Sequence, residues 1–151
     1  MEVITTSENR QLENMSDIIF NEDLTIFGID QLQALSYVGP VAACIGWNGK
    51  QTRDALCMAN SVEIEGARAG TSLRRILVTL IDCPDKLKRV LNKRNLRYND
   101  VDPRKHTLIE ILKAFMDANV SDVDIVSIFG LNIGLDVLCL LGGYKFVRDY
   151  E

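Results

Sequence analysis

The side chains best suited to chemistry are one histidine, one cysteine and a pair of aspartates. His106 is the only histidine, at an expected helix start, but acid–base catalysis would need a partner group that no motif supplies. Cys83 precedes Pro84 at an expected helix N-terminus, where a thiol is either reactive or, more commonly, inert. Asp122 and Asp124 stand where helix caps are expected. Phosphate loops, zinc-ligand spacings and nucleophile elbows are missing. The sequence therefore predicts no catalytic residue, no metal and no cofactor, and a protein that is not an enzyme.

Composition gives the next constraint on function. The chain has 151 residues, of which 47% are hydrophobic and 25% charged, and this is typical of one globular domain. The net charge of −4 disfavours non-specific binding of nucleic acid. The basic residues between Lys86 and Lys105 are expected on solvated helix faces. We therefore expect no nucleic-acid partner.

Cysteine spacing and the chain ends favour a cytoplasmic location. Four cysteines lie far apart without a CxxC pair, which fits neither a zinc site nor a disulfide framework and favours a reducing compartment. Met1–Arg10 is too polar and acidic for a signal peptide. The longest apolar stretch, Ile125–Leu141, is interrupted by polar residues and glycines, which indicates buried helices rather than a membrane span. No hydrophobic membrane anchor is expected.

The elements that must position any site are helices, because no segment sustains the alternating pattern of a strand. Asp30, Ser72 and Asp82 are expected helix caps, Pro40 is expected to kink or restart a helix, and Gly130 and Gly134 are expected to divide another. The expected helices cover residues 30–47, 51–65, 72–81, 82–96, 104–118, 121–141 and 142–150. The prediction is an all-α, single-domain helical bundle of about eight helices, with a flexible N-terminus (1–15) and one domain over 16–151.

Four short segments resemble the Bcl-2 family of apoptosis regulators. GGYKFVRDY, at 142–150, is similar to the second homology region of that family, with Tyr144 where a tryptophan is usual. LQALSYVG, at 32–39, looks like the segment in the first helix, and ALCMANSVEIEG, at 55–66, looks like the family's own BH3 helix. VLNKRNLRYNDVDPRK, at 90–105, looks like the fourth helix running into the first homology region. The order of the segments is that of the family, and the degeneracy resembles diverged virus-encoded members.

The resemblance implies a fold, a site and a partner. The fold is Bcl-2-like, with an apolar central helix. The site is a hydrophobic groove that accepts the amphipathic BH3 helix of a pro-apoptotic protein and so inhibits apoptosis. Lys105, or its neighbour Arg104, would pair with the ligand's aspartate. An apolar groove without its ligand favours self-association, so a homodimer is expected at high concentration. The implied groove residues are Leu87, Val90, Leu91, Arg104, Lys105, Leu108, Leu112, Tyr144 and Phe146. Tyr144 and Phe146 would pack inward after the glycines end the apolar helix.

Departures from the family pattern leave two alternatives open. Asn60 and Ser61 stand where the BH3 pattern has a glycine–aspartate pair, and Lys105 stands where the first homology region has arginine. The segment from His106 to Phe129 also looks like the last two helices of a death domain, so a death-fold adaptor is one alternative. The other is a Bcl-2-like fold that blocks innate immune signalling through a different face.

Overall fold

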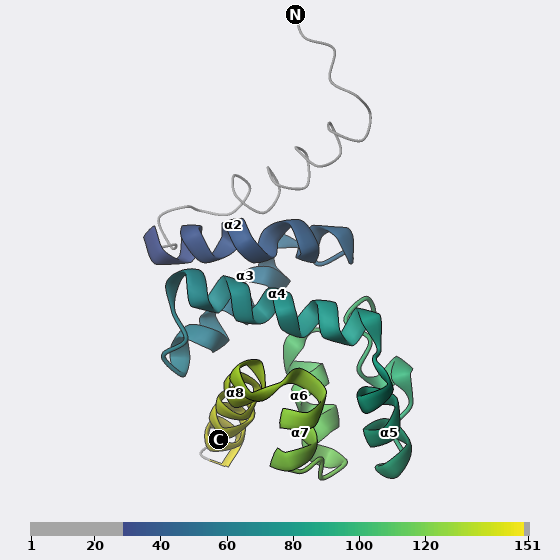
Figure 1. Cartoon of the computed structure of the whole chain (residues 1–151). Coiled ribbons are helices and arrows are strands. Elements are labelled where there is room, and N and C mark those ends of the chain that lie inside the picture. The colour runs from purple at the N-terminus through teal and green to yellow at the C-terminus, as the bar shows by residue number, and fades with distance from the viewer. Residues whose placement is uncertain (1–28, 150–151) are drawn as a thin grey trace, which may run out of the picture.

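The computed structural model describes residues 29–149 of the chain (Figure 1). Within this range it contains seven α-helices, one 3₁₀ turn and no β-strand. The prediction of an all-α, single-domain helical bundle is confirmed, with one α-helix fewer in these residues than the eight expected. The segment expected to be flexible, 1–15, lies outside the described residues.

The helices follow one another through short connections. Their bounds are α2 (Ile29–Cys44), α3 (Gly49–Ser61), α4 (Gly66–Asp82), α5 (Asp85–Lys93), the 3₁₀ turn η2 (Tyr98–Asp100), α6 (Leu108–Asp117), α7 (Asp122–Phe129) and α8 (Leu131–Asp149).

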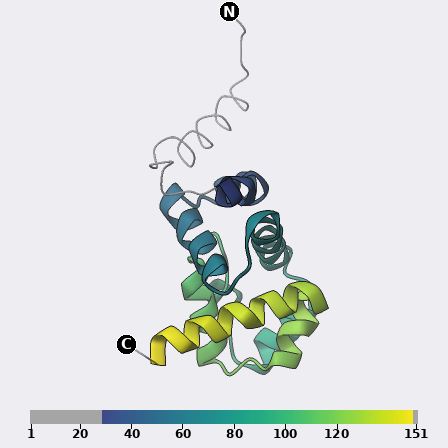
Figure 2. The same cartoon turned by 90° about the vertical axis from the view of Figure 1, so that its left-hand side faces the viewer.

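Helix α4 occupies the centre of the bundle. It packs against α2 and α3 on one side and against α7 and α8 on the other (Figures 1 and 2). Gly70 lies so close to α2 that an added Cβ would overlap the carbonyl group of Ala34, so only glycine permits this approach. Leu73, Leu77 and Leu80 of α4 are fully buried. They belong to one hydrophobic core to which all seven helices contribute.

Local sequence signals explain several helix ends. The side chain of Thr107 accepts a hydrogen bond from the Glu110 N–H, and Glu110 accepts one from the Thr107 N–H, which makes a capping box at the start of α6. Ser121 caps α7 by accepting from the Asp124 N–H, as expected from sequence. Gly130 has φ +83° and separates α7 from α8, which confirms one of the two expected divisions.

Other predicted boundaries are wrong because tertiary packing overrides local signals. Asp30 lies inside α2, and that helix also continues through Pro40. Helix α4 begins at Gly66, so Ser72 is a buried position within it rather than a cap. Asp82 ends α4, and Pro84 is the N-cap of α5.

The C-terminal helix also differs from the prediction. The two glycines at 142 and 143 were expected to end an apolar helix and to precede a short separate one. Instead α8 runs without interruption from Leu131 to Asp149, through Gly134, Gly142 and Gly143. No helix within residues 29–149 is long and apolar enough to cross a membrane.

Candidate functional site

The strongest candidate site is an apolar groove, here called the α3–α8 groove. It has a volume of about 410 Å³ and forms where the end of α3, the start of α6 and the last turns of α8 meet. Its lining residues are Cys57, Met58, Ser61, Val62, Ile109, Gly143, Tyr144, Val147 and Arg148. Arg148 is the charged member of this lining, so the groove offers an apolar surface with a cation at its edge.

The α3 side of the groove is fixed by the tight turn that follows this helix. The Ser61 hydroxyl donates to the Met58 carbonyl at 2.6 Å, and the Val62 N–H donates to the Ala59 carbonyl at 3.1 Å. Glu63 then adopts φ +64°, and buried Ile64 returns the chain to the core. Val62 is thereby held against α8.

The α8 side depends on the continuity of that helix. Because no break occurs at the glycines, Tyr144, Val147 and Arg148 lie at i, i+3 and i+4 and share one face. Gly143 supplies the close approach to Val62. A helix that ended at Gly142 would not present this face.

Helix α6 contributes Ile109, which lies within the capping box, between Thr107 and Glu110. The Thr107 N–H that bonds to Glu110 lowers the pKa of this carboxyl group, and the bond from the Thr107 hydroxyl and the proximity of His106 act in the same direction. The box therefore stabilises the first turn of α6 and the position of Ile109. Ile109 and Val147 are 45% and 56% exposed, so both have apolar surface that a ligand could bury.

The five aliphatic residues predicted to line the groove are placed elsewhere. They are at most 5% exposed and belong to the hydrophobic core: Leu87, Val90, Leu91, Leu108 and Leu112. Leu91 also borders a separate pocket beside Cys83 and Tyr98. Their burial means that a ligand reaches them only if the core opens.

The two predicted cationic anchors are engaged within the chain. The Arg104 side chain donates from Nε to the Asp102 carboxylate at 3.0 Å, and also donates to the Tyr98 hydroxyl at 3.2 Å. Lys105 donates to the side-chain oxygen of Asn99 at 2.8 Å. Neither residue lines the α3–α8 groove, where Arg148 is the cation.

Asp102 and Arg104 form a coupled pair. Burial acts to raise the pKa of Asp102, but the hydrogen bonds and charge of Arg104 outweigh it and hold this pKa below its usual value. The same pairing raises the pKa of Arg104, whereas burial, followed by the charge of Asp102, raises the pKa of Tyr98. The pair therefore stabilises the loop before α6.

The two predicted aromatic residues have different environments. Tyr144 lines the α3–α8 groove. Phe146 was expected to pack inward, but it is 63% exposed and lies outside the lining. Phe146 comes two residues after Tyr144 on a continuous helix, and the turn of the helix over two residues places it on another face.

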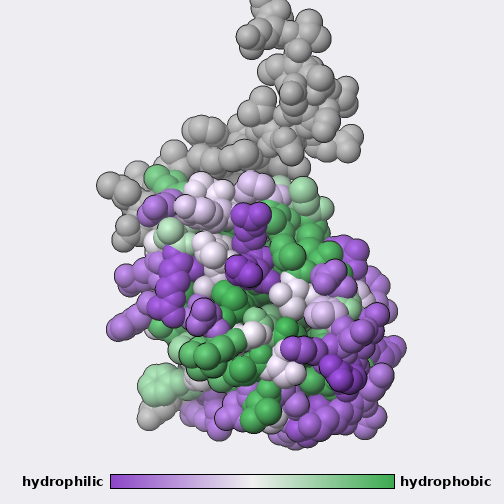
Figure 3. Space-filling model, viewed as in Figure 1, coloured by the Kyte–Doolittle hydropathy of each residue, from purple (hydrophilic) through white to green (hydrophobic). Residues whose placement is uncertain are grey.

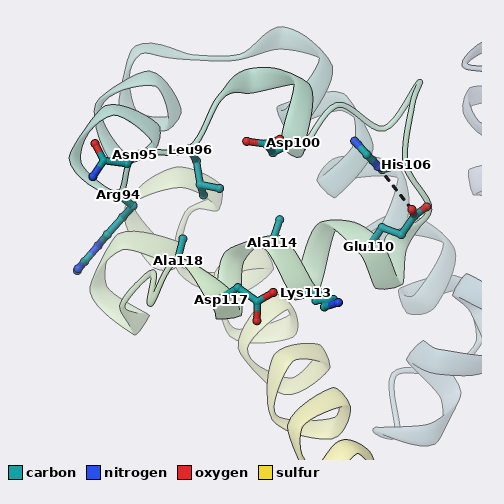
Figure 4. A pocket seen from close by; sticks show the side chains of 10 residues that line it. All are labelled: Arg94, Asn95, Leu96, Asp100, His106, Glu110, Lys113, Ala114, Asp117 and Ala118. Atoms are coloured by element: carbon teal, nitrogen blue, oxygen red, sulfur yellow. Dashed lines mark ion pairs between the residues drawn. The ribbon is translucent and has the colours of Figure 1, made fainter.

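The residues considered for chemistry lie on different elements of the fold. His106 donates from Nε2 to the Asn99 carbonyl oxygen at 2.8 Å, and its Nδ1 lies 3.6 Å from the carboxylate of Glu110, beside an open pocket lined mainly by polar residues (Figure 4). Cys83 has φ +48° and is the C-cap of α4. Asp124 is paired with Lys93 and Arg94. Among residues 29–149, no group of three or more histidine, cysteine or acidic side chains is arranged to hold a metal ion.

Comparison with known proteins does not identify a family. No protein-family model matches the chain, and no curated protein or solved structure matches it significantly. Of the nine residues that line the α3–α8 groove, only Tyr144 was among the predicted groove residues; its apolar members Met58, Val62, Ile109 and Val147 were not. Ile109 could have been recognised from the sequence, because it is an apolar residue that lies outside the buried stripe of its helix.

Proposed function

We propose that this chain is a Bcl-2-like inhibitor of apoptosis that sequesters pro-apoptotic proteins by binding their BH3 helix in the α3–α8 groove. The observation that carries the proposal is the convergence of the resembling segments. Segment 55–66 supplies Cys57 and Met58, and segment 142–150 supplies Tyr144 and Val147. Ile109 comes from the helix that directly follows segment 90–105. These segments are separate in the sequence and meet at one apolar pocket.

The groove has the properties that an amphipathic helix requires. Its volume of about 410 Å³ is at the lower end of the range for ligand pockets, roughly 300–1,000 Å³, and accommodates a few apolar side chains. Exposed apolar residues on two different helices, Ile109 and Val147, would be covered by apolar residues spaced i, i+3/i+4 on a ligand. Met58 adds an adaptable side chain, which suits recognition of related ligands.

Arg148 replaces Lys105 and Arg104 as the proposed partner of the ligand's aspartate. Its present partner, Asp149, lies 3.6 Å away, and both side chains are about half exposed. Exposed ion pairs of this kind contribute little, about 0–1 kcal/mol, so Arg148 can exchange Asp149 for a carboxylate on the ligand at small cost.

A death-fold or Bcl-2-like adaptor that blocks innate immune signalling is the second candidate. One observation favours the death fold: α3–α8 comprises six α-helices over residues 49–149, the helix number of that family. However, the segment resembling the last two death-domain helices forms α6 and α7, and α8 still follows. An adaptor of either kind is not expected to bind isolated BH3 peptides.

The test is calorimetric titration of the full-length protein with a panel of synthetic BH3 peptides. Submicromolar binding of at least one peptide is expected. Ile109→Glu should weaken it at least about tenfold, because burying one aliphatic side chain contributes roughly 1.5–3 kcal/mol and the charge adds a desolvation cost. Val123→Glu is the matched control, since Val123 is 74% exposed on α7 outside the groove. If no peptide of the panel bound, the result would contradict the proposal and favour the adaptors.

A further inference from the structure

A second groove lies on another part of the molecule, between α4 and the beginning of α8. This α4–α8 groove has a volume of about 680 Å³. Its lining residues are Ala67, Arg68, Thr71, Ser72, Arg75, Phe129, Gly130, Leu131, Asn132, Ile133, Leu135 and Asp136. On the face shown in Figure 3, hydrophobic surface gathers over the centre and lower left, whereas the side formed by α5 is hydrophilic.

The apolar wall of this groove is preformed. Leu131 and Leu135 are 65% and 49% exposed and stand at i and i+4 on α8, so they project side by side. Their positions are fixed because α7 and α8 are in close contact: a Cβ added at Gly134 would lie 2.9 Å from the Val126 Cα. Two neighbouring leucines held on a rigid helix form a surface that apolar side chains can cover.

The opposite wall carries positive charge. Asp136, the acidic residue of the lining, is 3% exposed and accepts hydrogen bonds from Arg68 (2.5 Å) and from the Ser72 hydroxyl. Its charge is therefore compensated inside the groove. Arg75 is exposed, and its side chain makes no hydrogen bond or ion pair with any residue that the structure describes. The charged lining thus sums to about +1, from Arg68 and Arg75 against Asp136, in a chain of net charge −4.

We propose that the α4–α8 groove binds an acidic amphipathic helix of a partner protein. Apolar side chains at i and i+4 of that helix would cover Leu131 and Leu135, and a carboxylate would pair with Arg75. Charge complementarity supports this occupant, because a local cationic wall in an acidic protein attracts acidic segments and repels basic ones. This site is independent of the proposed BH3 groove, since the two use opposite ends of α8.

Binding can be tested with two designed probes. Both are fluorescent helical peptides of about 16 residues, long enough to form helix, with the same leucines at i, i+3/i+4 spacing. One has glutamates beside the leucines and the other has lysines. Full-length protein carrying Ile109→Glu, which blocks the first groove, is titrated by fluorescence anisotropy. The glutamate peptide should bind at least about tenfold more tightly than the lysine peptide. Equal binding of both peptides, or no binding, would overturn the proposal.

Matched variants locate the site on the protein. Arg75→Glu and Leu135→Glu should each weaken the glutamate peptide about tenfold or more, since a charge reversal adds repulsion and a buried leucine is lost. Arg74→Glu is the control: it makes the same charge change one residue away on α4, outside the lining. An equal loss in Arg74→Glu would show that only overall charge matters and would overturn the assignment.

Cross-linking distinguishes a partner helix from occupants within or between copies of the chain. A photoreactive leucine in the glutamate peptide should mark residues 67–75 and 131–136 of the protein. Marking of other regions would refute the proposal. Self-association is measured by sedimentation. If the wild type self-associates and this displaces the peptide, whereas Leu135→Glu does not self-associate, the groove would instead be assigned to a second copy of the chain. Circular dichroism and urea unfolding confirm that each variant is folded.

Discussion

Gly143 on α8 and Val62 at the end of α3 lie so close together that a side chain at position 143 would require Val62 or the helices to shift. A Cβ added at Gly143 would lie 2.5 Å from the Val62 Cγ1, whereas one added at Gly142 meets no atom within 4 Å. The two adjacent glycines therefore differ in role although both lie inside α8. Gly143 allows α8 to pack on α3 and forms the base of the α3–α8 groove.

Alanine at each glycine should change the free energy of unfolding in opposite directions. Gly142→Ala should raise it by about 0.5–1 kcal/mol, because alanine favours the helix and the site is open. Gly143→Ala has the same helix preference, but forcing a methyl group against Val62 costs about 1–3 kcal/mol, so we expect a net loss of up to about 2 kcal/mol. Urea unfolding measures both variants. An equal increase in the free energy of unfolding of both variants would show that Val62 moves aside without cost.

The fold class could be predicted because the helical signals are local. The apolar stripe of Leu108, Ile111 and Leu112 lies within one segment, and the structure contains that helix, although it begins at Leu108 rather than at residue 104. The glycines of α8 were wrongly predicted to end a helix, because the contact that explains one of them is not local. Glycine disfavours a helix locally, but the contact of Gly143 with Val62 comes from residues far apart in the sequence.

The candidate site was harder to predict than the fold. A periodic stripe shows which side of a helix faces inward, but not whether that side meets another helix or a ligand groove. The family resemblance implied that Leu108 and Leu112 line a groove, and the structure places both in the hydrophobic core. Likewise, nothing in the sequence shows that Asp102 is buried and occupies Arg104. Tyr144 was identified only through its position in a motif.

Acid should destabilise the fold through Asp124. Burial acts to raise its pKa, but hydrogen bonds involving Ser121, Lys93 and Arg94 outweigh this and hold the pKa below the usual 3.8. As pH falls, the unfolded chain takes up this proton first, so stability is lost from about pH 5 down through the folded pKa. Asp124→Asn should be less stable at neutral pH and should lose less stability between about pH 6 and pH 3.

The control for Asp124 is its neighbour Asp122→Asn. Asp122 is exposed and its carboxylate accepts only from the adjacent Val123 N–H among the hydrogen bonds recorded for the described residues. Asp122→Asn removes a negative charge from the same turn of α7 but no ion pair with Lys93 or Arg94, so it serves as the reference for Asp124→Asn in thermal or urea unfolding. If Asp124→Asn matched the wild type across the acid range, the pairing with Lys93 and Arg94 would carry no pH-dependent stability.

Charge reversal should separate Arg104, a cation that stabilises the fold, from Arg148, the cation proposed to contact the ligand. Arg104→Glu places a carboxylate beside buried Asp102, whose hydrogen-bond donor is lost, so the urea midpoint should fall clearly. Lys105→Glu removes only an exposed contact with Asn99 and should leave the midpoint near the wild type. Because neither residue lines the α3–α8 groove, the folded variants should bind BH3 peptides within about threefold of the wild type, a difference of less than about 0.7 kcal/mol.

Arg148→Glu should give the reverse pattern, with an unchanged midpoint and weaker peptide binding. The exposed pair with Asp149 contributes little to the fold, whereas a reversed charge at the groove edge repels the aspartate of the ligand. We expect an affinity loss of about tenfold, and replacing the peptide's aspartate by alanine should recover part of it because the repelled charge is gone. Calorimetry with both peptides and both proteins completes this double-mutant cycle. The opposite result would be a loss of affinity in Lys105→Glu together with full affinity in Arg148→Glu. It would show that Lys105, the residue first predicted from sequence, pairs with the ligand's aspartate, and that the BH3 site lies away from the α3–α8 groove.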